Sequence, residues 1–200
     1  MDKISKCIFY GDSNTYGYDP ADYMEGRYAL RERWTSIAAE QLKERFLILP
    51  EGMNGRKLPD LGIDQSYLLK LIRTTGEGDL FCTMLGTNDI LNSGRPDARL
   101  PIRKMEKYLS FLTGYLLPRQ ILILAPPYIG DGTETYQLIR LFHSESVRMN
   151  QGFAELCRRM SIPFADTAGW DIGLSYDRVH FSADGHRQFA EKIVQLLTKR

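Results

Sequence analysis

The sequence predicts a three-layer α/β/α sandwich built around a parallel β-sheet. Short apolar runs alternate along the chain with longer segments in which apolar residues recur every three or four positions. The short runs are apolar on both faces, as strands buried inside a parallel sheet are. Strands and helices that alternate in this way place helices on both faces of the sheet. A chain of 200 residues, 43% of them hydrophobic, suits a single domain over residues 1–200.

Five strands are expected, one in each short apolar run. They cover residues 4–10, 46–50, 80–85, 120–125 and 162–165. The first run ends at Gly11, a residue that allows the chain to turn sharply. The last run is the shortest of the five.

Five helices are expected in the remaining segments, and four of them carry an apolar stripe typical of a helix that faces a core. The stripes are Trp34, Ile37, Ala38 and Leu42; Ile102, Met105, Leu109, Leu112 and Leu116; Met149, Phe153, Leu156 and Met160; and Phe189, Ile193 and Leu196. Pro101 suits the first turn of the second of these helices, and Ser182 suits the N-cap of the last. Residues 64–75 are expected to form a less regular helix.

Composition narrows the classes of function. The formal net charge is +1 and the basic residues are dispersed, which predicts neither a nucleic-acid-binding surface nor a polybasic membrane patch. No apolar run is long enough to span a bilayer, and residues 1–10 lack the pattern of a signal peptide. The three cysteines lie in apolar segments without a CxxC or Cys–His spacing, so we expect buried, reduced thiols in a cytoplasmic protein. No cofactor is expected, and no HExxH-like spacing predicts a catalytic metal.

Four polar motifs lie just beyond predicted strands. They are residues 11–13 (GDS), 52–56 (GMNGR), 86–89 (GTND) and 177–180 (DRVH). The carboxyl ends of parallel strands share one edge of the sheet, and ligands bind there. We therefore expect the motifs to meet in one crevice and to supply the serine, histidine, carboxylate and oxyanion donors that acyl transfer requires. Three long connections, residues 17–30, 91–100 and 126–136, are expected to overhang this crevice.

Ser13 is the candidate nucleophile and His180 the candidate base. A serine hydroxyl is a weak nucleophile until a neighbouring base takes its proton. Asp177 precedes His180 by three positions, so the two side chains would share a face on one helical turn. Asp177 would then accept the Nδ1 proton of His180 and leave Nε2 free for Ser13. The structural alternatives are a serine that only caps a turn and a surface Asp–His pair.

Asn88 and Gly55 are the candidate oxyanion-hole donors, together with the backbone N–H of Ser13. The Asn88 amide can donate to an oxyanion, and the missing side chain of Gly55 permits a close approach to its N–H. The alternative for both residues is a structural position in a turn. Of the other two histidines, His186 belongs to the core stripe of the last helix, and His143 lies in a polar helical stretch and is expected to face solvent.

The four motifs in this order resemble the four blocks of the SGNH hydrolases, also called the GDSL esterase/lipase family. The blocks are residues 10–17 (YGDSNTYG), 51–56 (EGMNGR), 86–89 and 177–180. The resemblance implies a flavodoxin-like sheet of five parallel strands, a nucleophile at Ser13, oxyanion donors at Ser13, Gly55 and Asn88, and a base pair at Asp177 and His180. The second block is similar to the arylesterase-like branch, although Lys57 stands where that branch usually has threonine. Several members of that branch form oligomers, so the resemblance also implies a possible homo-oligomer.

The predicted function is a serine esterase that hydrolyses small or short-chain carboxylic esters, with a small-molecule ester as its partner. Carbohydrate deacetylation and lysophospholipid hydrolysis on the same site are alternatives within the family. A flavin- or phosphate-binding flavodoxin-like module is a different alternative, because a turn rich in Gly, Ser and Thr follows the first strand. Asp12 places negative charge in that turn and no Lys or Arg lies in it, which argues against a phosphate ligand. A catalytically inactive carbohydrate-binding relative is the last alternative.

Overall fold

A computed structural model describes residues 4–24, 26–133 and 135–200. Its centre is a five-stranded parallel sheet in the order β2-β1-β3-β4-β5. The strands are β1 (Ser5–Gly11), β2 (Phe46–Gly52), β3 (Leu80–Met84), β4 (Ile121–Leu124) and β5 (Phe164–Ala165). The predicted α/β/α sandwich with a flavodoxin-like parallel sheet is therefore confirmed. The fifth strand is shorter than expected, because only its last two residues pair with β4.

Seven α-helices and three short 3-10 helices occur in the described residues. The α-helices are α1 (Ser13–Tyr16), α2 (Trp34–Leu42), α3 (Gln65–Ile72), α4 (Thr87–Leu91), α5 (Arg99–Thr113), α6 (Gln137–Arg159) and α7 (Ala183–Thr198). The 3-10 helices are η1 (Leu30–Glu32), η2 (Pro118–Gln120) and η3 (Thr167–Trp170). The sequence did not predict α1 and α4 as separate helices; they are single short turns that follow β1 and β3.

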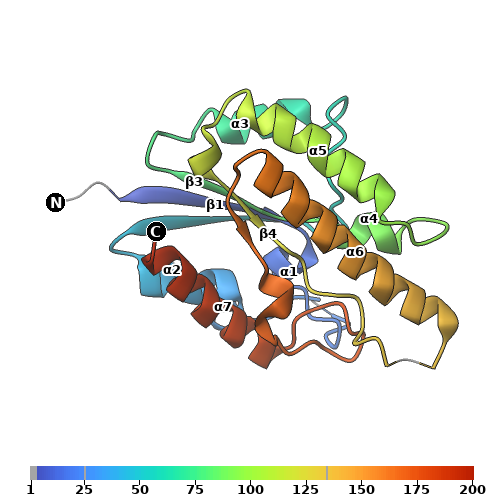
Figure 1. The fold of residues 1–200 in the computed structure, drawn as a ribbon. Coiled ribbons are helices and arrows are strands. Elements are labelled where there is room, and N and C mark those ends of the chain that lie inside the picture. Colours follow the sequence, from blue (N-terminus) through green and yellow to red (C-terminus); the bar gives the residue numbers. More distant parts are fainter. Residues whose placement is uncertain (1–3, 25, 134) are drawn as a thin grey trace.

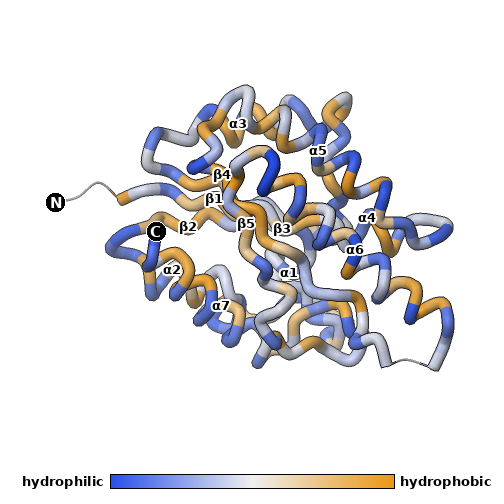
Figure 2. The backbone as a smooth tube through the Cα atoms, in the orientation of Figure 1, coloured by the Kyte–Doolittle hydropathy of each residue, from blue (hydrophilic) through white to orange (hydrophobic). Residues whose placement is uncertain are grey.

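Helices cover the two faces of the sheet in two groups, α3, α5 and α6 on one face and α2 and α7 on the other (Figure 1). Alternate residues of β1 point into the two cores: Ile8 and Tyr10 pack with α3 and α5, whereas Cys7 and Phe9 pack with α2 and α7. Both faces of each central strand are thus buried, which explains the unbroken apolar runs. The hydrophobic positions accordingly line the inner side of both helical layers (Figure 2).

The predicted helical stripes lie in these cores, with three differences in detail. Met160 follows the end of α6 at Arg159 and is only partly buried. α5 ends at Thr113, so Leu116 is buried in the turn after the helix and not on it. On α7, Leu197 is fully buried, whereas Leu196 packs only partly against the core. The three cysteines are free and buried, as expected, and burial raises the pKa of the Cys157 thiol to about 12. In the described part of the chain no helix is long and apolar enough to cross a membrane.

Candidate active site

The carboxyl ends of β1, β2 and β3 bring three of the predicted motifs to one edge of the sheet. Gly11, at the end of β1, lies in register with Gly52 on β2 and with Met84 on β3. Gly52 packs directly against the backbone of α1, and a side chain there would collide with Tyr16 N. The strand order reverses direction between β1 and β3, and this switch point is where parallel sheets of this type open a crevice.

Ser13 is the first residue of α1, immediately after β1. The Asp12 side chain caps this helix by accepting the backbone N–H of Asn14 at 3.0 Å, and Gly17 ends it with φ of 85°. The turn is well packed, and Ser13 and Asp12 are only 7% and 2% exposed. Burial raises the pKa of Asp12 to about 6, although the hydrogen bond from Asn14 and the nearby charge of His180 oppose the shift. Ser13 is therefore held in a short, capped and buried turn at the carboxyl end of β1.

Ser13, His180 and Asp177 form a continuous chain of hydrogen bonds. Ser13 Oγ lies 2.9 Å from His180 Nε2, and His180 Nδ1 lies 2.6 Å from Asp177 Oδ2. The other carboxylate oxygen, Asp177 Oδ1, accepts the backbone N–H groups of Val179 and His180, each at 3.0 Å. Burial acts to raise the pKa of Asp177, but the hydrogen bonds from His180 and the backbone outweigh it and the pKa is lowered. An ionised Asp177 suits an imidazole that must accept a proton.

The expectation that Asp177 and His180 share a helical turn is wrong. Residues 176–180 form a turn between Leu174 and Phe181, which face each other in an isolated antiparallel bridge. Arg178 takes a left-handed conformation with φ of 57°. The carboxylate reaches the imidazole because it also binds the turn's own N–H groups, as an Asx side chain does.

The long connection after α1 supports the histidine from the side. The Tyr18 ring lies against the His180 imidazole, with ring centroids 4.7 Å apart. Tyr176, in the turn that carries His180, donates its hydroxyl to Pro20 O at 2.8 Å. The other two tyrosines of this connection differ: Tyr28 packs edge-on to His186, whereas Tyr23 is almost fully exposed.

The predicted oxyanion donors other than Ser13 lie in the loop after β2, which holds Gly55, and on α4, which holds Asn88; the loop and the helix are hydrogen-bonded to each other. The side-chain amide of Asn88 donates one hydrogen to Arg56 O at 3.1 Å, and its second hydrogen has no partner among the described residues. The backbone N–H groups of Ser13 and Gly55 likewise donate to no protein group in the described ranges. Gly86 is the N-cap of α4, the helix that carries Asn88, and has a φ of 127°. A side chain at Gly86 would collide with Met149, so only glycine fits at this start of the helix.

Two further residues of the motifs, Arg56 and Asp89, hold the loop after β2 in place. The sequence did not indicate these roles. The Arg56 guanidinium is buried over the Tyr10 ring at 4.2 Å and donates to Gly11 O at 2.9 Å and to Glu51 O. Asp89 accepts the backbone N–H of Leu58 and the ammonium of Lys104, both at 2.8 Å. The motifs pointed to Arg56 and Asp89, but their partners lie on other elements and carry no local signal.

The two remaining histidines have different surroundings. His186 is fully buried, as expected; its Nδ1 accepts the backbone N–H of Trp34 at 3.3 Å, and burial lowers its pKa to about 3. The expectation that His143 faces solvent is wrong. It is half-buried, with Nδ1 3.2 Å from both Ile129 O and Gly130 O, because the connection after β4 folds back over α6.

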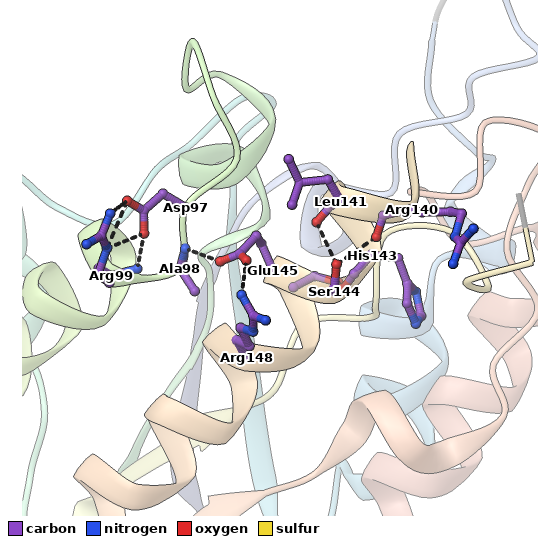
Figure 3. A network of polar contacts seen from close by, with 10 residues as sticks. Asp97, Ala98, Arg99, Arg140, Leu141, His143, Ser144, Glu145 and Arg148 are labelled. Atoms are coloured by element: carbon purple, nitrogen blue, oxygen red, sulfur yellow. Dashed lines mark hydrogen bonds and ion pairs between the residues drawn. The ribbon is translucent and has the colours of Figure 1, made fainter. Parts of the chain in front are cut away.

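The connection between α4 and α5 is hydrogen-bonded to α6 (Figure 3). Glu145 of α6 accepts the backbone N–H of Ala98 at 2.9 Å and pairs with Arg148 at 2.6 Å. Asp97 pairs with Arg99 beside it, which lowers the pKa of Asp97 to about 2. The described residues contain no group of three or more His, Cys, Asp or Glu side chains that could hold a metal ion.

Comparison with known proteins places this arrangement in a family. The sequence model of the GDSL-like Lipase/Acylhydrolase family matches residues 9–188. No curated protein sequence matches the chain. Among solved structures, the native aryl esterase of M. smegmatis is 25% identical, with a TM-score of 0.78 and coverage of 98% of this chain and 99% of that one.

Two other similar structures are esterases that act on carbohydrates according to their descriptions. Est24, a carbohydrate acetylesterase from Sinorhizobium meliloti, is 21% identical with a TM-score of 0.78, and the match covers 98% of this chain and 99% of the Est24 chain. A catalytic mutant of Axe2, an acetylxylan esterase from Geobacillus stearothermophilus, is 16% identical with a TM-score of 0.71, and covers 98% and 95%. At these identities the likeness establishes the fold. From the family match, the chain belongs to the GDSL-like lipase/acylhydrolase family and is a carboxylic ester hydrolase.

Proposed function

We propose that this protein is a serine esterase for small or short-chain esters, in which Ser13 is the nucleophile, His180 the general base and Asp177 its orienting carboxylate. The observation that carries the proposal is the hydrogen-bonded chain from Ser13 Oγ through both ring nitrogens of His180 to Asp177 Oδ2. This arrangement lies beside N–H donors that have no partner in the described part of the chain. Acyl transfer through a covalent intermediate requires such a combination of nucleophile, base and donors.

The reaction proceeds in two halves. Ser13 Oγ bonds to the ester carbonyl carbon as its proton moves to His180 Nε2, and the carbonyl oxygen becomes an oxyanion. The C–O bond to the alcohol then breaks, and the alcohol leaves with the proton from Nε2. Water next attacks the acyl–Ser13 ester, again losing its proton to Nε2, and the carboxylic acid is released as Ser13 regains its proton. Asp177 remains ionised throughout and stabilises the imidazolium.

Three donors are available for the oxyanion: the N–H groups of Ser13 and Gly55 and the second amide hydrogen of Asn88. Each such donor contributes roughly 3 kcal/mol to transition-state stabilisation. Because Asn88 is fixed through Arg56 O and Gly55 lies in the same loop as Arg56, the two donors are held in a constant relation to each other. Pre-organised donors of this kind cost no reorganisation during the reaction.

Hydrolysis of p-nitrophenyl acetate tests the nucleophile and the base. Ser13→Ala and His180→Ala should each lower kcat by at least about 10⁴-fold, since the members of a triad act as a unit. Ser110→Ala is the matched control, because Ser110 is exposed on α5 and its hydroxyl donates to Glu106 O in the same helix. Wild-type rates in both site variants would show that the roles are assigned wrongly.

The oxyanion donor has its own prediction. Asn88→Ala should reduce kcat for the same ester by about 10²- to 10³-fold with a smaller change in KM, because the donor acts mainly on the transition state. Asn92→Ala is the control for disturbance of α4; Asn92 is exposed at the end of that helix, and its amide donates to the backbone O of Asn88 at 3.0 Å and to its side-chain Oδ1 at 3.5 Å. Equal losses in the two variants would mean that the substitutions only disturb α4.

Deacetylation of carbohydrates is the second candidate, because Est24 and Axe2 are described as carbohydrate and acetylxylan esterases. A series of p-nitrophenyl esters from acetate to octanoate, measured beside acetylated xylo-oligosaccharides, separates the candidates. A sharp preference for acetate together with release of acetate from the sugar favours deacetylation. Turnover of short aryl esters with no activity on the sugar favours the aryl or simple short-chain esterase.

A further inference from the structure

Asn14 connects the segments that carry the proposed nucleophile and the proposed base. Both polar atoms of its side chain form hydrogen bonds to backbone groups. Asn14 follows Ser13 on α1 and is 2% exposed. Its Oδ1 accepts the backbone N–H of Phe181 at 2.8 Å, and its Nδ2 donates to Val179 O at 3.1 Å. The two bonded groups belong to the peptide units on either side of His180. One carboxamide therefore holds the backbone of His180 at both ends.

We propose that Asn14 is the positioning residue that sets His180 against Ser13. Ser13 and Asn14 share the short, capped turn of α1, so the turn that carries Oγ also fixes the backbone that carries the imidazole. The main chain of Asn14 is itself held: its N–H donates to Asp12, and its carbonyl oxygen accepts the indole N–H of Trp34 at 2.8 Å. Trp34 is fully buried, so this chain of bonds connects the base to the core.

The other bonds of the histidine turn lead elsewhere. Ser175 N–H donates to His180 O at 2.7 Å within the turn itself. Tyr176 binds Pro20 O, and Gly130 N–H donates to Arg178 O at 3.0 Å, which join the turn to two long connections. Among the described residues, the Asn14 carboxamide alone makes hydrogen bonds between α1 and the backbone of this turn. Without it, the 2.9 Å approach of Ser13 Oγ and His180 Nε2 depends on bonds that reach the histidine turn only through the long connections, such as that of Tyr176 to Pro20 O.

A carboxamide is required because one neighbour is an acceptor and the other a donor. Asn14→Leu keeps a similar volume and removes both bonds. Asn14→Asp keeps the acceptor for Phe181 N–H but turns a carboxylate oxygen toward the carbonyl of Val179, which repels it. Since a misplacement of about 1 Å can lower a rate about 10²-fold, we expect kcat to fall roughly 10- to 100-fold in both variants with little change in KM.

The test is a double-mutant cycle on p-nitrophenyl acetate, with wild type, Asn14→Leu, His180→Ala and the double variant. This inference rests on the proposed function, and it states that Asn14 acts through His180. Asn14→Leu should therefore lower kcat in the wild-type background and have no further effect once His180 is replaced. Gln195→Leu, which replaces an amide by leucine at an exposed position of α7, is the matched control and should retain wild-type kcat.

Each failure has a separate meaning. Full activity of Asn14→Leu beside an inactive His180→Ala overturns the positioning role alone, whereas full activity of His180→Ala overturns the proposed function. An equal loss from Asn14→Leu in both backgrounds means that Asn14 supports the fold generally, and this also overturns the inference. If Asn14→Leu does not fold, Asn14→Asp takes its place in the cycle, because it retains the bond to Phe181 and a good residue for a helix start.

Discussion

His180 and His186 are close in the sequence, but their imidazole rings differ in burial and in hydrogen-bond partners. His180 lies in a turn, its side chain is 19% exposed, and each ring nitrogen meets a polar side chain. His186 lies on the first turn of α7, is fully buried among Tyr28, Phe181 and Trp34, and meets no carboxylate in the ranges that the structure describes. Nε2 of His186 has no hydrogen-bond partner at all among the described residues.

The difference shows what an imidazole needs in order to carry a proton in turnover. A carboxylate and partial access to water stabilise the imidazolium beside Asp177. Burial without a countercharge penalises the charged form, and the pKa of His186 is lowered to about 3. The first environment can support proton transfer and the second can only support packing.

Removing the charge beside His180 should have the largest effect. Asp177→Asn keeps an oxygen for the backbone N–H groups of Val179 and His180 but takes away the carboxylate that orients Nδ1–H and stabilises the imidazolium. We expect kcat for p-nitrophenyl acetate to fall by roughly 10³- to 10⁴-fold, as in other triads of this kind. A loss of less than tenfold would mean that the environment of His180 does not depend on its charged partner.

Acidification should destabilise the fold through the buried His186. The unfolded chain binds a proton on His186 near pH 6.5, whereas the folded protein does so only near pH 3, so the stability that neutral His186 contributes is complete above pH 6.5 and is lost as the pH falls. Between pH 7 and pH 4 the free energy of unfolding should drop by roughly 3 kcal/mol from this group.

Urea unfolding of wild type and His186→Gln at the two pH values measures this contribution. The variant should be less stable at pH 7, because it loses packing, but should lose less stability on acidification. Its activity should stay within about tenfold of wild type at pH 7. An identical pH dependence in the two proteins would contradict the assignment of a neutral, buried imidazole.

The smallest effect concerns the aromatic support of His180. Tyr18→Ala removes the ring that packs 4.7 Å from the imidazole, whereas Tyr18→Phe keeps the ring and loses only the hydroxyl. A contact of this kind contributes about 1 kcal/mol, so kcat should fall about three- to tenfold in Tyr18→Ala and hardly change in Tyr18→Phe. Equal losses in both variants would indicate that the hydroxyl matters more than the ring.

Much of the fold could be predicted because the burial of a strand or helix determines where apolar residues occur along its sequence. The run from Leu80 to Met84 is apolar except for the buried Thr83, since both faces of β3 are covered. The stripe of α5 follows the helical repeat because one side of the helix faces the core. The ends of the strands were also predictable, because a parallel sheet brings all carboxyl ends to the same edge. Ser13 and Asn88 could be singled out in this way without knowledge of their contacts. The expectation that residues 177–180 also follow a strand end is wrong, because η3 and a further segment separate β5 from the turn that carries His180.

Burial patterns and strand ends along the chain were thus enough to predict the layers, the sheet edge at which the proposed site lies and most of the residues of that site. The tertiary structure alone decided how the loops at that edge fold: the Asx turn of Asp177, the burial of His143, and the bonds of Asn14 to Val179 and Phe181. Periodicity reflects how each residue meets its own helix or strand and the adjacent core. A hydrogen bond between residues more than 160 positions apart depends on where two loops arrive in space, and no repeat along the chain records that.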